Sequence, residues 1–201
     1  MSLRYYLYIS DSKVDILLPQ IDPAFGRTRE TEIGFNLRVA AGKRKVEATS
    51  DRIARLDRVV RYLDDFADVG TVDEPGQYFR GRMRMRWGPV GGELVWFAGA
   101  TSRTVVGLGG SRAHVAGEGE PSGSSTLPGM VEGLRSVLAE EGGAEALATV
   151  HLAARQLRGT EQELEFVAKR LGQGPSPYPE LDPRAGMTVL VGSPIFVALA
   201  D

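Results

Sequence analysis

The stretch that decides the fold is residues 5–21, YYLYISDSKVDILLPQI. Its first five residues carry aromatic, β-branched or Leu side chains without a polar break, which predicts a buried strand. Residues 10–12, Ser-Asp-Ser, end that strand and start a helix that Ser12 can cap. One helical face then carries the apolar residues Val14, Leu17, Leu18 and Ile21. The chain therefore opens with a strand, a polar turn and a short helix.

Composition narrows the class of protein. The chain has 201 residues, no Cys, and 24 basic against 26 acidic residues, for a net charge of −2. Without Cys there is no thiolate catalysis, zinc–sulfur site or disulfide. The balanced charge gives no attraction to nucleic acid, and no apolar run approaches the ~20 residues of a membrane span. We expect a cytoplasmic protein, with no signal peptide, no metal or cofactor, and no nucleic-acid or membrane partner.

The rest of the chain mixes strands and helices around a meander of strands. Strands are expected near 33–39, 45–47, 78–87, 93–98, 103–108, 187–191 and 195–199, the last two forming a pair or one bent strand. Helices are expected from Thr49 or Ser50 to about 70, from Pro128, and over 144–171 with a break at Gly159. This order predicts one α+β domain over 1–201, with a mixed, largely antiparallel sheet and helices packed mainly on one face. Mobile loops are expected near 116–127 and 172–186.

A glycine-rich run, GLGGSRAH at 107–114, follows one of these strands. Such backbone can form an anion-binding nest, to which Ser111 and His114 would add side-chain donors. The run matches neither the Walker loop nor the dinucleotide-binding fingerprint. A tight turn that needs glycine is the alternative. The candidate ligand-binding residues here are Gly109, Gly110, Ser111 and His114.

Two other polar turns follow strong strands. Ser10, Asp11 and Lys13 lie where a strand ends and a helix begins, a place where α/β folds bind ligands. Helix capping alone is the competing explanation. Ser193 lies in the third turn, between the last two apolar runs. A single binding pocket formed by all three turns requires them to lie close together in the fold.

Four arginines alternate with apolar residues over 78–87. Arg80, Arg82, Arg84 and Arg86 share one strand face, opposite the aromatic rings of that strand. Guanidinium groups in a row can bind an anion or a protein partner. An exposed, acid-paired face that protects an edge strand is the alternative. Single-stranded RNA is disfavoured, since its recognition needs aromatic rings on the same face.

Five motifs span nearly the whole chain. They are YLYISDSKVDILLPQI (6–21), DVGTVDEPGQYFRG (68–81), VVGLGGSRAH (105–114), HLAARQLRGTEQELEFVAKRL (151–171) and GSPIFVALAD (192–201). Together they resemble an uncharacterised family common in actinobacteria, whose members are described only as a domain of unknown function. The resemblance implies a sensing or interaction role, regulatory or defence-associated, and transfers no catalytic residue.

These observations predict a non-enzymatic module that binds a small polar or anionic ligand or a partner protein. A homodimer is compatible with the sequence. The alternative is a hydrolase or lyase that uses His114 with Ser111 or Asp11. There is no G-x-S-x-G nucleophile elbow. The second histidine, His151, is predicted to be a partly buried structural residue on a helix.

Overall fold

The computed structural model describes residues 4–21, 41–90, 93–116, 134, 146–182 and 184–200, and for 41–50 the backbone alone. The chain divides into two compact units. One unit comprises residues 11–67, and the other combines residues 1–10 with 68–201. The predicted strand at 33–39 and nearly all of the predicted loop at 116–127 lie outside the described residues. The assignment of 1–201 to a single domain stays a prediction.

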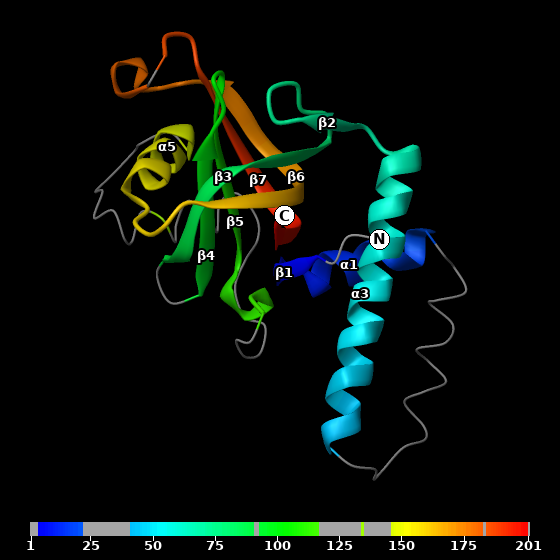
Figure 1. The fold of residues 1–201 in the computed structure, drawn as a ribbon. Coiled ribbons are helices and arrows are strands. Elements are labelled where there is room, and N and C mark those ends of the chain that lie inside the picture. Colours follow the sequence, from blue (N-terminus) through cyan, green and yellow to red (C-terminus); the bar gives the residue numbers. More distant parts are fainter. Residues whose placement is uncertain are drawn as a thin grey trace. The chain divides into compact units, whose positions relative to one another are not determined.

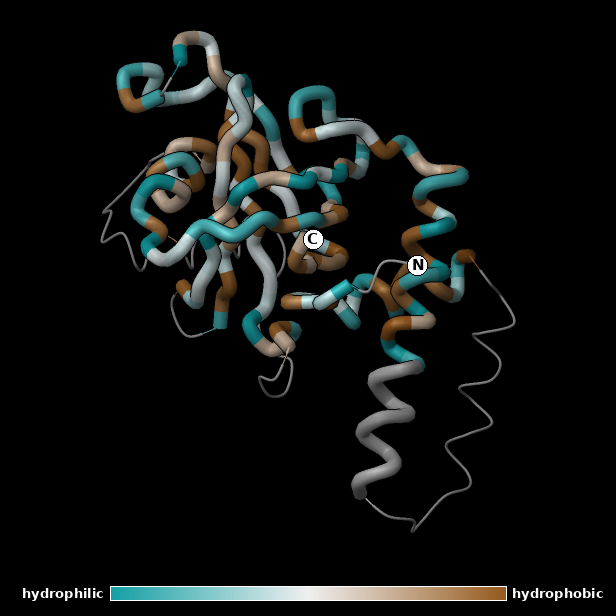
Figure 2. Tube along the Cα trace, viewed as in Figure 1, coloured by the Kyte–Doolittle hydropathy of each residue, from teal (hydrophilic) through white to brown (hydrophobic). Residues whose placement is uncertain are grey.

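The smaller unit contains two helices, α1 (Asp11–Ile21) and α3 (Ala41–Phe66). Their buried residues are Val14 and Leu18 on α1 and Leu56, Val59 and Leu63 on α3, and the two helices contact each other. Figure 2 shows hydrophobic and hydrophilic residues alternating along the second half of α3, as expected for an amphipathic helix. Arg52 pairs with Asp11 at 2.7 Å, and Arg55 pairs with Asp15.

The start of α3 corrects the prediction. We expected a short strand at 45–47 and a helix that starts at Thr49 or Ser50, but one helix of 26 residues begins at Ala41. The Lys, Arg, Glu and Ala residues of 41–48 are good helix formers, and no proline separates them from the amphipathic segment that follows. Phe66, predicted in the buried stripe, is 74% exposed.

The larger unit is built on a seven-stranded mixed sheet (Figure 1). Its elements are β1 (Tyr5–Ile9), β2 (Val69–Thr71), β3 (Tyr78–Val90), β4 (Leu94–Ala100), β5 (Thr104–Ser111), η1 (Arg112–His114), α5 (Ala146–Gln156), β6 (Gln162–Pro175), η2 (Pro179–Leu181) and β7 (Thr188–Leu199). The strand order is β1-β7-β5-β4-β3-β2, and β6 pairs with both β3 and β7. The pairings are antiparallel except β5 with β7 and β2 with β3, which are parallel.

The fold class is therefore confirmed as α+β with a mixed, largely antiparallel sheet. The expectation of helices packed mainly on one face is not confirmed, because β6 joins β3 to β7 and closes the sheet into a barrel. A closed sheet has an inside and an outside rather than two open faces.

Two apolar clusters explain the composition of the central strands. Phe97, Leu108 and Leu190 belong to a cluster that fills the barrel. Their strand neighbours Trp96 and Val189 belong to a second cluster, which includes α5 residues. Alternate residues of β4, β5 and β7 thus face the barrel and α5. Strands buried on both faces read as continuous apolar runs, which is why these three were easy to predict.

Two elements in the second half of the chain differ from expectation. Residues 162–171, predicted as helix, form the first part of β6, because their apolar residues pack into the barrel between β3 and β7. β6 continues to Pro175, so the loop that follows is shorter than the predicted 172–186. The last two apolar runs form one strand, β7, with irregular pairing to β6 near Pro194. That outcome matches the bent-strand alternative.

Candidate functional site

The glycine-rich run lies inside a strand rather than in a loop. Gly109 and Gly110 pair with Trp96 and Val95 of β4, and all of β5 is buried. A Cβ on Gly110 would lie 2.3 Å from Tyr8 Oη, and one on Gly107 would lie 2.3 Å from Trp96 Cζ2. The glycines let large rings lie directly against β5. The structure therefore contradicts both conformations predicted for this run, the anion-binding nest and the tight turn.

His114 lies at the end of η1 and is 5% exposed. Its Nδ1 is 3.4 Å from the Tyr8 hydroxyl, and the two rings meet edge to face at 5.8 Å. Ser111, the last residue of β5, is also buried. The structure thus buries both residues, with His114 against Tyr8 of β1 and Ser111 paired with Leu94 of β4.

The other turn candidates are divided between the two units. Ser193 lies within β7 rather than in a turn. Ser10 and Ser193 are both buried, and the Ser10 N–H donates to the carbonyl of Ile195, two residues after Ser193, at 2.8 Å. Asp11 and Lys13 belong to α1 in the other unit, where Asp11 pairs with Arg52. Their proposed role in ligand binding stays a prediction.

The arginine row follows the predicted alternation along β3. Arg80, Arg82 and Arg84 are exposed and Arg86 is half-buried, while Phe79, Met83 and Met85 are buried. The neighbouring β6 and the residue that precedes it provide acidic partners. Arg82 lies 3.8 Å from Glu163, and Arg86 lies 2.9 Å from Glu161. Two of the arginines are thus paired with acids in this way.

Arg84 and Arg86 also line a hollow of about 470 Å³ on the outside of the barrel, which we name the arginine hollow. Arg155 of α5 is the third cation of its lining and Glu161 the one carboxylate. The remaining lining residues are small or apolar, namely Ala98, Gly99, Ala100, Val105 and Ala154. Three arginines thus line a space whose other described lining residues, apart from Glu161, have small or apolar side chains.

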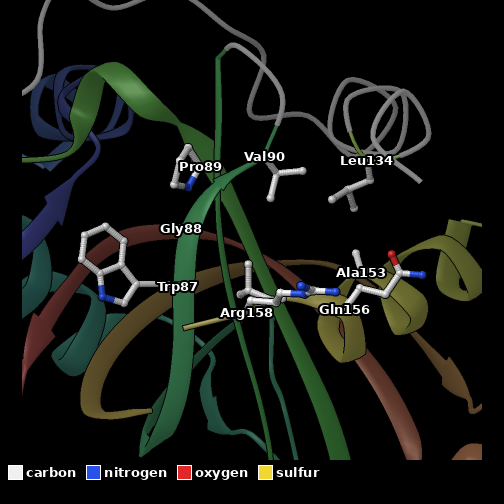
Figure 3. A pocket seen from close by; sticks show the side chains of 9 residues that line it. Trp87, Gly88, Pro89, Val90, Leu134, Ala153, Gln156 and Arg158 are labelled. Atoms are coloured by element: carbon white, nitrogen blue, oxygen red, sulfur yellow. The ribbon is translucent and has the colours of Figure 1, made fainter. Parts of the chain in front are cut away.

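A second space, of about 390 Å³, lies beside the carboxyl end of α5, and we name it the apolar pocket (Figure 3). It is lined by Trp87, Gly88, Pro89, Val90, Leu134, Ala153, Gln156, Leu157 and Arg158. Figure 3 shows Val90, Leu134, Ala153, Gln156 and Arg158 on one side of β3 and the Trp87 ring on the other. That ring stacks on Phe97 and donates to Gln162 Oε1 at 2.8 Å, so it supports the strand.

A buried polar cluster joins α5 to the loop between β6 and β7. His151 Nδ1 lies 3.2 Å from Ser176 Oγ, and His151 Nε2 lies 3.1 Å from Asp182 Oδ1. The side chains of His151 and Asp182 are fully buried, and neither Asp182 oxygen makes an aligned hydrogen bond among the described residues. The Tyr178 ring packs against the imidazole at 5.8 Å.

Burial lowers the pKa of His151, and the charge of Arg155 lowers it further, while Asp182 and Glu180 oppose the shift. The neutral imidazole can accept from the Ser176 hydroxyl at Nδ1 with its proton on Nε2, toward Asp182. Serine, histidine and aspartate also occur in hydrolase triads. Here neither of the two pockets described above is lined by Ser176. We assign the cluster a structural role, anchoring the loop to α5.

The comparison with protein families covers the whole fold just described. A family model, described as a family of unknown function (DUF7019), matches residues 4–201. The chain belongs to this family. The resemblance inferred from the sequence motifs is thereby confirmed, and the actinobacterial association stays a prediction. No curated protein and no solved structure matches the chain.

In this DUF7019 chain, sequence reasoning found Arg84 and Arg86 of the arginine hollow but missed the rest of its lining and the apolar pocket. Gln156 and Arg158 were not singled out, and Arg155 was not linked to the arginine row. No local signal could have found them, because α5 and β3 are about 70 residues apart in sequence and meet only in the folded barrel.

Among the described helices, none has both the length and the apolar character needed to cross a membrane.

Proposed function

We propose that the chain is a binding module for a small ligand with an apolar body and an anionic end, and that the apolar pocket is its site. The observation that carries this proposal is one apolar space of about 390 Å³ with two polar side chains at its edge. Small-molecule sites typically measure roughly 300–1,000 Å³ and combine apolar walls with few polar groups.

The lining suggests how such a ligand would lie. Leu134 and Ala153 are buried and Val90 is half-buried, so an apolar body would replace water against them. Gln156 and Arg158 are exposed, and Arg158 is the only charged residue among the described residues of the lining. The carboxyl end of a helix carries partial negative charge. The anionic group would therefore lie against the guanidinium of Arg158, away from the last carbonyls of α5.

A fluorescent aromatic sulfonate, 8-anilinonaphthalene-1-sulfonate, has the proposed chemistry and serves as the probe. We expect saturable binding to the native protein, weakened about tenfold by Arg158→Ala. Val90→Phe, which fills the pocket from the end of β3, should abolish it. Arg82→Ala changes an arginine outside the pocket and is the matched control.

Melting temperatures of all three variants check that they fold, because this dye also binds loosened proteins. Equal binding by the native protein and folded Val90→Phe would contradict the proposal. A partner protein, a homodimer, the cytoplasmic location and the regulatory or defence-associated role stay predictions. So does the alternative of a hydrolase or lyase using His114 with Ser111 or Asp11.

A further inference from the structure

The arginine hollow shares no residue with the apolar pocket and has a different chemistry. The described residues of its lining include three arginines, Arg84, Arg86 and Arg155, and one carboxylate, Glu161, which gives a formal charge of +2. The net charge of the whole chain is −2. The positive charge of the lining is therefore concentrated locally, and it favours binding of an anion in the hollow.

Two of the three guanidinium groups are held in place by the protein. Arg86 pairs with Glu161 at 2.9 Å, and its Nε donates to the Gly159 carbonyl at 3.2 Å. Gly159 has φ +129°, a backbone conformation that residues with a side chain rarely adopt. Arg155 donates to the Leu181 carbonyl. An Arg side chain has five N–H donors, so both residues keep donors for a ligand.

The third arginine and the small walls leave room for that ligand. Arg84 is exposed and has no ion pair with any residue that the structure describes. Small residues of β4 and α5, namely Ala98, Gly99 and Ala154, line the hollow with it. A Cβ on Gly99 would lie 2.5 Å from the Arg84 carbonyl, so a larger residue there would displace the strand that carries Arg84.

The loop that contacts Arg155 is anchored as well. Leu181, which accepts from Arg155, directly precedes Asp182, whose carboxylate lies 3.1 Å from His151. His151 and Arg155 are one turn apart on α5, where side chains lie about 5–6 Å from each other. The buried cluster thus holds both the loop and the helix turn that position Arg155.

We infer that the arginine hollow binds the phosphate group of a small phosphate monoester. A phosphate monoester carries about −1.5 to −2 charges near pH 7 and three acceptor oxygens. That charge matches the +2 of the lining, whereas a monoanionic carboxylate would leave about half of it uncompensated. One guanidinium group can donate two parallel hydrogen bonds to a phosphate group, which a lysine ammonium group does not do. A site made of arginines rather than lysines therefore suits phosphate.

Phenyl phosphate is the probe, titrated by isothermal calorimetry into the full chain at low salt, with phenyl sulfate as the singly charged counterpart. We expect saturable binding that is at least about tenfold tighter for the phosphate and that weakens as salt is added. Arg84→Ala should weaken binding about tenfold or more. Arg82→Ala, two residues away on the same strand face but outside the hollow, should change it less than about twofold.

Arg84 is the preferred site of substitution because Arg155→Ala also removes the contact with Leu181. Arg155→Lys keeps the charge and should still weaken binding through loss of the paired donors. Equal weakening by Arg82→Ala and Arg84→Ala would overturn the inference, since it would mean a diffuse charge effect. Absence of saturable binding to the native protein would also overturn it. A phosphoserine peptide that binds more tightly than phenyl phosphate would overturn the assignment to a small ligand.

Discussion

Substitution of Gly110 by Ala tests whether the glycines of β5 serve ring packing. The new Cβ would lie 2.3 Å from Tyr8 Oη, 2.6 Å from Cζ and 2.9 Å from Cε2. Tyr8 is fully buried, and its ring meets Phe97 at 6.0 Å and His114 at 5.8 Å, both edge to face. The ring therefore cannot turn into solvent, and either the strand or the ring must shift.

The expected loss of stability follows from two terms. Overpacking a core by one methyl group costs about 1–3 kcal/mol, and moving Tyr8 away from His114 costs a further ~1 kcal/mol for the hydroxyl contact. We expect a loss of about 2–4 kcal/mol in the free energy of unfolding. For a chain of this size the melting temperature falls by roughly 2–4 °C per kcal/mol, so a shift of about 4–16 °C is expected.

Gly88→Ala is the matched control in β3. A Cβ at Gly88 would meet only Leu157 Cδ1, at 4.0 Å, so the change should stay within about 0.5 kcal/mol. Urea unfolding followed by circular dichroism measures both variants, with thermal melting as a second readout. If Gly110→Ala and Gly88→Ala unfold with equal free energies, the packing argument for β5 is refuted.

The remaining predictions concern charges. Because burial and Arg155 lower the pKa of His151, the unfolded chain binds a proton that the native protein refuses once pH falls below about 6.5. The stability contributed by the neutral imidazole is therefore present above that pH and lost below it. The melting temperature of His151→Gln should fall less from pH 7 to 5 than that of the native protein, and an equally steep fall would argue against this. Burial raises the pKa of Asp73, but hydrogen bonds from Thr101 at 2.6 Å and Thr104 at 2.8 Å, with Arg103, lower it overall. Asp73→Ala should cost about 1–3 kcal/mol at pH 7. The cost should shrink as pH falls below the ordinary Asp value of about 3.9, because the unfolded chain then takes up a proton that the native carboxylate, with its lowered pKa, still refuses; a constant cost from pH 7 to 2 would contradict the hydrogen-bond account. Arg82→Ala breaks an exposed pair 3.8 Å from Glu163 and should cost less than about 1 kcal/mol in chemical denaturation, so a loss above 2 kcal/mol would be inconsistent with an exposed pair.

Local patterns in the sequence were sufficient for much of the fold. The strand at Tyr5–Ile9, the helix after it, the arginine-bearing strand and the last strand all have patterns set by their own residues. β6 was misassigned because Leu164, Val167, Ala168 and Leu171 also fit helical spacing. The acids Glu163 and Glu165, opposite Arg84 and Arg82 in the register, identify it as a strand only once its partner is known.

The candidate sites were harder to predict because they depend on tertiary contacts. The glycine-rich run has the composition of a loop, and only the rings of Tyr8 and Trp96 explain why glycine is needed within a strand. His151 lies on α5, whereas Ser176 and Asp182 lie in the loop between β6 and β7. No spacing in the sequence relates a helix residue to a loop that begins 25 residues later.

The central claim is that the apolar pocket holds a small ligand, and native mass spectrometry of gently purified protein tests it most directly. The native chain and Val90→Phe are expressed in the natural host and purified side by side, with melting temperatures to confirm folding. The account predicts a reproducible small-molecule adduct on the native chain that the filled-pocket variant lacks. Identical spectra, with the adduct on both proteins or on neither, would contradict it.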